Sequence, residues 1–399
     1  MISPLSIAGM ALLLVASGAC LLLSYSLWTR RVFDWLPAYV SNALKSRPRH
    51  QGPTHVMFCF VDHYEPRWGR ADYDTERERV RRWCETYPRL CKSHVDADGR
   101  PPRHTFFYPE EEYRPEHMRD LVDLCAQGYG EIEIHLHHDD DTDEGLRAKL
   151  RSFVDLLSRD HDALPVSPIT GKPAWAFVHG NWALDNSRPD GRWCGVDNEL
   201  IVLSEEGCYA DFTLPSAPDA TQTSTINSIY YALDDPHQPK SHDRGVAVRV
   251  GGQPSGHLMI VQGPLGLNWR WRKFGLVPRI ENADIRRSSP PRPDRTDLWI
   301  RSGIHVQGRP EWVFVKIHTH GTQETDIDTL LGAPVDAMFS DLETRYNDGK
   351  KYVLHYVTAR EMYNIIKAAE AGSSGNPGQY RNFVVPAPTF RPTARATEA

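Results

Sequence analysis

Short apolar segments alternate with amphipathic helical segments along most of this 399-residue chain. Apolar runs typical of strands occupy residues 55–61, 105–108, 131–136, 174–178, 209–214, 312–317 and 352–357. Helical patterns lie between several of them, at residues 74–92, 115–127, 142–160, 334–346 and 358–371. Alternating strands and helices predict parallel strands joined by crossover helices, either in a barrel or in an open sheet. We therefore predict an α/β fold.

Polar side chains follow five of the predicted strands at the point where each strand ends. They are Asp62 and His63, His135 to Asp139, His179 to Asn181, Asp211, and His318 to His320. In α/β barrels the carboxyl ends of the strands form one face, and that face carries the active site. The sequence therefore predicts that these side chains share one pocket.

The richest of these stretches covers residues 131–141, where three histidines and several carboxylates are crowded together. Its first residues alternate between charged and apolar, so Glu133, His135 and His137 are expected on one face of a strand. Nitrogen and oxygen donors that converge at a strand end favour a divalent-metal site. The competing interpretation is a solvated acidic loop that contains histidines by chance.

The amino-terminal segment is apolar. Residues 5–28 contain no charged side chain, and as a helix they would be about 36 Å long, enough to cross a bilayer. We predict a transmembrane helix at residues 5–28, after a short terminus at residues 1–4 and before a juxtamembrane segment at residues 29–52. The basic residues that follow the span favour a single-pass membrane protein with a cytoplasmic body.

Composition limits the possible partners of the body. The net charge is −6 and there is no long basic run, which argues against nucleic acid as a partner. The globular pattern covers residues 53–371. Residues 372–399 are rich in Gly, Ser, Pro and Thr, and we predict a disordered tail there. The sequence leaves the oligomeric state open.

In this order, the polar stretches resemble the motifs of the polysaccharide deacetylases, the NodB-like carbohydrate esterases of family 4, over residues 53–371. Residues 60–63 stand where the family has a strand ending in two adjacent acids. His135 and Asp139 stand where it has two histidines four residues apart. The later motifs are matched by residues 178–186, which lack the usual arginine, by residues 207–212 and by residues 315–318. The resemblance implies a distorted (β/α)7-type barrel.

The resemblance also implies roles for individual residues. The implied metal ligands are His63, His135 and Asp139, a set that suits Zn²⁺ or another divalent ion. Asp62 takes the position of the catalytic base, and His318 or His320 would protonate the leaving group. The implied substrate-binding residues are His179, Asn181 and Asp211. A competing alignment makes Asp62 a ligand, together with His135 and either His137 or His138.

The function implied by the resemblance is a metal-dependent hydrolase that removes N-acetyl or O-acetyl groups from a polysaccharide or lipid-linked glycan. One alternative is a glycosidase on a related seven-stranded barrel, which needs two carboxylates about 5 to 10 Å apart. Asp62 and Asp211 are the evident pair for that reaction. A second alternative is a catalytically inactive glycan-binding protein, which the departures from the family motifs favour.

Overall fold

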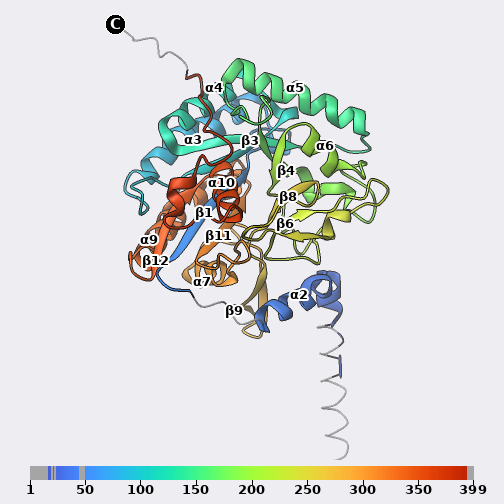
Figure 1. The fold of residues 1–399 in the computed structure, drawn as a ribbon, viewed down its shortest axis with the longest axis vertical. Coiled ribbons are helices and arrows are strands. Elements are labelled where there is room, and N and C mark those ends of the chain that lie inside the picture. Colours follow the sequence, from blue (N-terminus) through green and yellow to red (C-terminus); the bar gives the residue numbers. More distant parts are fainter. Residues whose placement is uncertain (1–16, 19–20, 22–23, 45–49, 393–399) are drawn as a thin grey trace, which may run out of the picture.

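Strand β1 (Thr54–His63) lies at the centre of the computed structural model, which describes residues 17–18, 21, 24–44 and 50–392 (Figure 1). All but its first two residues are buried, as expected for an apolar run covered on both faces. Along one edge β1 pairs in parallel with β11 (Trp312–Thr319). Along the other edge it pairs first with β12 (Tyr352–Val357) and then with β2 (His104–Pro109).

The sheet extends beyond β2 on one side only. Four more parallel strands follow in spatial order: β3 (Gly130–Leu136), β4 (Trp175–His179), β5 (Cys208–Asp211) and β8 (Leu258–Val261). Two antiparallel strands complete it: β6 (Ile229–Ala232) and β7 (Gly245–Ala247). The described residues thus form a mixed ten-stranded sheet. A separate antiparallel hairpin consists of β9 (Gly266–Lys273) and β10 (Val277–Glu281).

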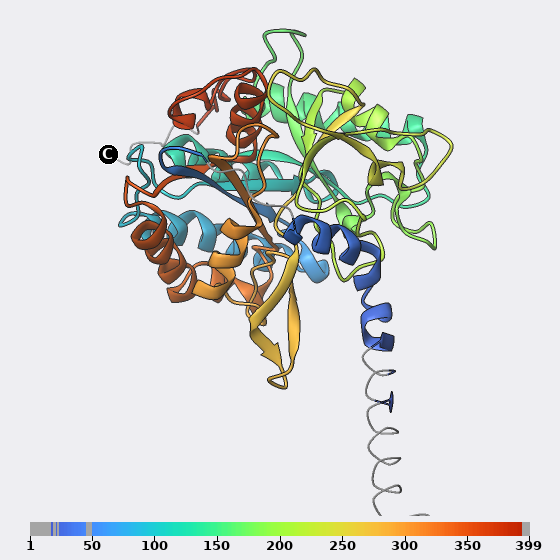
Figure 2. The same cartoon turned by 60° about the horizontal axis from the view of Figure 1, so that its bottom comes forward.

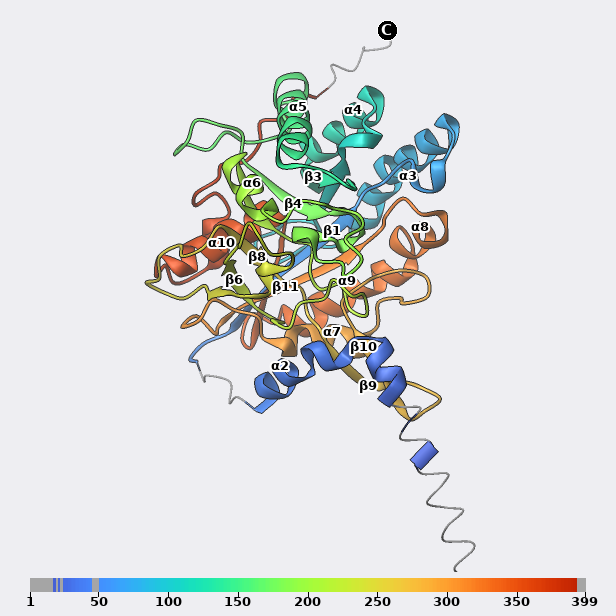
Figure 3. The same ribbon diagram turned by 90° about the vertical axis from the view of Figure 1, so that its right-hand side faces the viewer.

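Helices cover the two faces of the sheet (Figures 1 and 3). They are α3 (Tyr73–Cys91), α4 (Pro115–Leu124), α5 (Asp143–His161), α6 (Glu199–Glu205), α7 (Pro293–Ser302), α8 (Glu324–Leu330), α9 (Ala333–Tyr346) and α10 (Ala359–Glu370). Because side chains alternate along a strand, β1 serves two cores. Phe58 and Phe60 belong to the core that includes α3, α4, α5 and α9. Cys59 and Val61 belong to the core that includes α10.

The α/β class is confirmed, but the predicted seven-stranded (β/α)7-type barrel is wrong. The described sheet has ten strands, and β6 and β7 run antiparallel to their neighbours. The segments at residues 245–250 and 256–261 flank a Gly-Gly-Gln-Pro turn, but they do not pair with each other. Strand β6 lies between them instead, because it pairs with β8 on one side and with β7 on the other.

The segment before β1 packs against the body through α2 (Val32–Leu44). Trp35 is fully buried in a small core with Ala217 and Leu265, and the helix lies beside β9 and β10 (Figures 2 and 3). Residues 5–16, 19–20 and 22–23 of the predicted span lie outside the described residues. In the part that is described, each helix is too short or too polar to span a bilayer. The predicted transmembrane helix and single-pass localisation are therefore not supported.

The carboxyl-terminal segment is ordered as far as residue 392, in contrast to the expectation of a disordered tail. A short 3-10 turn forms at Pro377–Tyr380. Arg381 is buried and binds the carboxylates of Asp96, Asp98 and Glu361. A single cation with three buried or half-buried carboxylate partners fixes this segment to the body. Residues 393–399 lie outside the described residues.

Candidate functional site

Strands β1, β3 and β11 end at the same edge of the sheet, and their histidines meet there. The ring centroid of His63 lies 4.9 Å from that of His135, 4.6 Å from that of His320 and 6.5 Å from that of His318. The ring of His137 lies 4.6 Å from the ring of His135. The structure therefore brings together predicted site residues that are more than 250 positions apart in the sequence.

Glu65 lies among these imidazoles. We call the six residues the histidine cluster: His63, Glu65, His135, His137, His318 and His320. One ligand atom from each of His63, Glu65 and His135 can be chosen so that all three lie within 4.8 Å of one another, and the three residues are buried. Two imidazoles and one carboxylate suit a divalent first-row ion. This group could hold a metal ion.

The hydrogen bonds of His135 prepare it to act as a ligand. Its Nδ1 donates to the carbonyl oxygen of Val178 at 2.7 Å, so Nδ1 carries the proton of the neutral ring. Burial and the nearby His137 lower the pKa of His135 to about 3. Its Nε2 is therefore a bare acceptor at neutral pH, and it lies 3.3 Å from Oε1 of Glu65. Two facing acceptors require either a proton or a cation between them.

The electrostatics of the cluster favour neutral imidazoles. Burial lowers the pKa of His63, and the neighbouring His320 and His135 lower it further. Burial also lowers the pKa of His318 and of His320. The Glu65 carboxyl is shifted the other way, because burial raises its pKa. His63, His135, His318 and His320 thus bring lone pairs together without adding a positive charge.

His137 differs from its neighbours because it has a carboxylate partner. Burial lowers its pKa, but the hydrogen bond to Glu111 and the charges of Glu65, Glu111 and Glu112 together outweigh this effect, and the pKa of His137 is raised. Its Nδ1 lies 2.5 Å from Oε1 of Glu111, which belongs to the 3-10 turn Glu110–Glu112 after β2. Gly180 packs against this ring so closely that a Cβ atom there would lie 2.3 Å from Cδ2 of His137.

Two tryptophans border the cluster. The ring of Trp182 lies 6.2 Å from that of His63 and 5.8 Å from that of His320. The ring of Trp68 lies 6.3 Å from that of His320, and Trp68 is 46% exposed. No sequence pattern singled out Trp68. Both rings are in reach of a molecule that approaches His320 from solvent.

Asp62 is placed on the face of β1 opposite to His63. It is fully buried, and its carboxylate accepts hydrogen bonds from Nε2 of His104 at 2.9 Å and from the Gly321 N–H at 2.6 Å. A Cβ atom on Gly321 would lie 2.0 Å from Oδ2 of Asp62, so only glycine permits this approach. We expected Asp62 to act as the base or as a ligand. Its contacts instead hold the loop that carries His320.

Asp139 lies outside the histidine cluster. It is exposed, and its Oδ1 accepts a hydrogen bond from the Trp193 N–H at 2.6 Å. Strand β3 ends at Leu136, and Asp140 has a φ of 48°, so the chain turns away from the cluster here. The four-residue spacing between His135 and Asp139 therefore does not place them together.

The three predicted substrate-binding residues are also dispersed. Asn181 is half-buried in the 3-10 turn Gly180–Trp182, with a φ of 54°. Asp211 is buried, accepts hydrogen bonds from the Thr213 N–H and hydroxyl, and has its pKa raised to about 7 by burial. His179 points away from the histidine cluster, toward Glu199.

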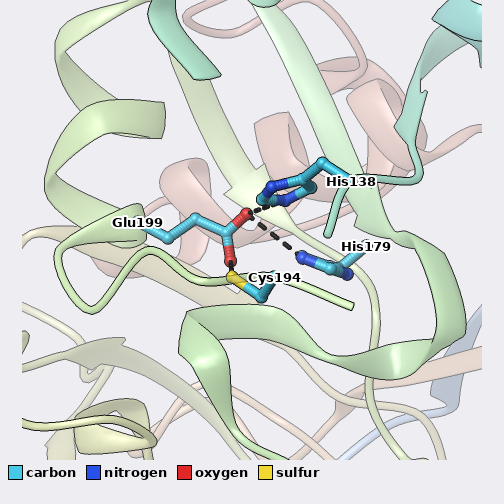
Figure 4. Close-up of side chains that lie close together, drawn as sticks. All are labelled: His138, His179, Cys194 and Glu199. Carbon is cyan, nitrogen blue, oxygen red and sulfur yellow. Dashed lines mark hydrogen bonds and ion pairs between the residues drawn. The ribbon is translucent and has the colours of Figure 1, made fainter. Parts of the chain in front are cut away.

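His179 belongs to a second buried group, the Cys194 group, which consists of His138, His179, Cys194 and Glu199 (Figure 4). These four residues could also hold a metal ion. We did not single out Cys194, Glu199, Glu65 or Glu111 from the sequence. Glu65 had a signal, because it follows His63 at the same-face spacing of two residues. Glu111, Cys194 and Glu199 lie in or after loops and had no comparable signal.

Neither protein-family models nor curated proteins match this chain. The resemblance to the polysaccharide deacetylases therefore stays a prediction. The buried groups that could hold a metal ion are features of the structure itself.

Proposed function

We propose that this protein is a metal-dependent hydrolase that removes N-acetyl or O-acetyl groups from a polysaccharide or lipid-linked glycan. The observation that carries the proposal is the convergence of His63, Glu65 and His135 at the ends of β1 and β3, with Nε2 of His135 left free by the bond from Nδ1 to Val178. The order of these strand-end residues along the chain resembles that of the deacetylase motifs.

The proposed ligands are His63, Glu65 and His135, and the proposed ion is Zn²⁺. Two histidines and one glutamate form a common ligand set of catalytic zinc sites. A bound divalent ion lowers the pKa of water and polarises a carbonyl oxygen. Glu65 replaces Asp139 in this assignment, because Asp139 lies outside the cluster and is bonded to the Trp193 backbone.

The remaining histidines divide the proton transfers. Hydrolysis of an acetyl amide or ester requires one group to accept a proton from water and another to give a proton to the leaving nitrogen or oxygen. Nδ1 of His318 is the proposed acceptor, because this buried nitrogen has no hydrogen-bond partner among the described residues. His137 is suited to donate, because Glu111 raises its pKa. Asp62 acts as a positioning residue for the loop of His320.

The surroundings of the cluster fit a sugar. The faces of aromatic rings stack against the apolar faces of sugar rings, and Trp68 and Trp182 lie beside His320. The glycosidase alternative has less support, because the carboxylates of Asp62 and Asp211 are each engaged in buried hydrogen bonds of their own.

The test compares wild-type protein with His135→Ala. The substrates are an N-acetylated chito-oligosaccharide and an O-acetylated xylan, and released acetate and bound zinc are measured. His135→Ala should lower acetate release by at least about a thousandfold, because a catalytic metal supplies several kcal/mol of transition-state stabilisation. It should also lower the zinc content by one ion per chain. His237→Ala, at an exposed histidine, is the matched control and should change neither quantity.

Two results would overturn this proposal. A metal-free protein that cleaves an aryl glycoside would establish the glycosidase instead. A protein with zinc in the histidine cluster that binds the oligosaccharide but releases no acetate from either substrate would be a glycan-binding protein.

A further inference from the structure

The Cys194 group lies outside the proposed catalytic site and gathers four different segments of the chain (Figure 4). His138 follows β3 by two residues, His179 is the last residue of β4, and Glu199 is the first residue of α6. Cys194 comes from the loop between them. The residues are 0–6% exposed, and one ligand atom from each can be chosen so that all lie within 4.8 Å of one another.

The distances between potential ligand atoms are those of a small coordination shell. Nε2 of His138 lies 3.1 Å, and Nε2 of His179 lies 3.3 Å, from Oε1 of Glu199. The Cys194 sulfur lies 3.6 Å from Oε2 of the same carboxylate. With bonds of about 2.0–2.3 Å, tetrahedral zinc holds its ligand atoms about 3.3–3.7 Å apart. The two nitrogen-to-oxygen distances come close to this geometry, and the other ligand atoms, which lie within 4.8 Å of one another, would have to move closer by up to about 1.5 Å.

Each potential ligand is oriented by a second contact. Asp141 Oδ2 lies 3.2 Å from Nδ1 of His138, which forms the carboxylate–histidine pair common around metals. The Asp185 N–H donates to Oε2 of Glu199 at 2.6 Å, which leaves Oε1 for a ligand bond. The Asn186 N–H donates to the Cys194 sulfur at 3.3 Å. These contacts fix the tautomer, the carboxylate oxygen and the sulfur that face the centre.

One nitrogen of this group is left without a hydrogen bond. Nδ1 of His179 lies 2.5 Å from the Gly180 carbonyl oxygen, to which it can only donate, so its Nε2 is the nitrogen that is available to a cation. That Nε2 is fully buried, has no hydrogen-bond partner among the described residues and is aimed at Glu199. Buried polar atoms are nearly always paired, so either a proton or a metal ion is expected between this nitrogen and the carboxylate. The four potential ligand atoms within 4.8 Å of one another favour the metal ion.

We propose that His138, His179, Cys194 and Glu199 form a second metal site, a closed structural site for a zinc-like ion. Four protein ligands leave no position for substrate, which distinguishes structural zinc sites from catalytic ones. The ion would fasten the loop at residues 180–198, which includes Trp182, to the ends of β3 and β4. Binding displaces the proton of the Cys194 thiol to solvent, because the ligand is the thiolate.

Cobalt provides the test, because Co²⁺ replaces Zn²⁺ and gives a thiolate-to-cobalt absorption band in the near ultraviolet when sulfur is a ligand. The full chain is loaded with Co²⁺, its cobalt content is measured and its spectrum is recorded. Wild-type protein should bind two cobalt ions per chain and show the band. His63→Ala should lose one ion and keep the band, whereas Cys194→Ala should lose one ion and the band. Cys125→Ala, at another buried free cysteine, should change neither.

The wild-type spectrum decides the outcome even where Cys194→Ala does not fold. A wild-type chain without the thiolate band overturns the proposal, whatever its cobalt content. A band that persists in Cys194→Ala also overturns it, because another cysteine would then be the ligand. A failure of the proposed hydrolase function looks different, because it leaves the band intact and removes only the release of acetate.

Discussion

The histidine cluster and the Cys194 group are both buried and both lie near strand ends, but their charges are balanced differently. Glu65 in the histidine cluster lies 3.3 Å from Nε2 of His135 and 3.7 Å from Nε2 of His137. Burial raises the pKa of this carboxyl by more than His320 and His137 lower it. Burial alone would also raise the pKa of Glu199, but His179 and His138 lower it by more. Burial therefore outweighs the neighbouring imidazoles at Glu65, whereas the imidazoles outweigh burial at Glu199.

The two groups also differ in their exposure to solvent. Trp68 beside the histidine cluster is 46% exposed, whereas all four members of the Cys194 group are buried. Catalytic metal sites keep a position open for substrate, and structural sites are closed by protein ligands. We therefore expect substitutions in the histidine cluster to change activity and substitutions in the Cys194 group to change folding.

The largest expected effect is on stability, at Glu199. Glu199→Ala should lower the free energy of unfolding by about 3–5 kcal/mol, because it leaves the buried partners of the carboxylate unpaired. Glu65→Ala should lower it by only about 1 kcal/mol, because burial raises the pKa of this carboxyl and so opposes its charge. Urea unfolding followed by circular dichroism measures both. Equal losses would erase the distinction between the two groups.

A third group, in which Asp96 and His355 are buried and Asp98 is exposed, differs from both because the protein itself supplies its cation. Asp96, Asp98 and His355 could hold a metal by geometry, yet Arg381 already binds both carboxylates. Arg381 and Arg103 also bind Glu361. We therefore expect chelators to leave this group intact.

Acid should weaken the ion pairs of Glu361, which shares Arg381 with this third group. Burial raises the pKa of Glu361, but Arg103 and Arg381 lower it by more, so the folded-state pKa lies below the ordinary 4.5. A carboxyl whose pKa is lowered by folding stabilises the folded state fully above its unfolded-state pKa. This stabilisation is lost as the pH falls from the unfolded-state pKa through the folded-state pKa. Urea unfolding at pH 7 and about pH 3.5 should show a smaller acid loss for Glu361→Gln than for wild-type protein. Identical losses in the two proteins would show that Glu361 is not responsible for the loss of stability in acid.

A smaller effect is expected at Glu111, which orients His137. Glu111→Gln should lower acetate release about 10- to 100-fold, as is typical for a carboxylate behind a functional histidine, and should leave the zinc content unchanged. Glu110→Gln in the same turn is the matched control. If both variants lose activity equally, the turn matters and the Glu111 contact does not.

The smallest effect is expected at Asp139. Asp139→Ala removes one exposed hydrogen bond and should change the free energy of unfolding by less than about 1 kcal/mol. Zinc content and acetate release should stay at the wild-type level. Loss of one zinc ion would instead restore the ligand set of His63, His135 and Asp139 that the motif resemblance implies.

The alternation of charged and apolar residues correctly predicted which side chains share a face of a strand, because successive side chains in a strand point to opposite faces. The alternation at residues 131–137 placed Glu133 and His135 on the face opposite to Ile134, and the structure agrees. The strand-end rule placed His63, His135 and His318 together. Both inferences depend only on strand geometry, which the sequence pattern reveals directly.

Other features depended on contacts that the sequence does not encode locally. Nothing in residues 229–261 shows that β6 inserts between β7 and β8. Asp62 and His63 are adjacent, so only one of them can face the cluster, and the family motif did not show which. Asp139 was chosen by its spacing from His135, but a turn at Asp140 separates them.

The three-sided pairing of β1 has a consequence for metal exchange. Its amides are hydrogen-bonded along both edges, so they should be among the slowest in the chain to exchange with deuterium. Because His63 ends this strand, the geometry of its ligand atom is set before an ion arrives. Uptake and release of the ion at the histidine cluster should then proceed without unfolding of the strand that carries His63.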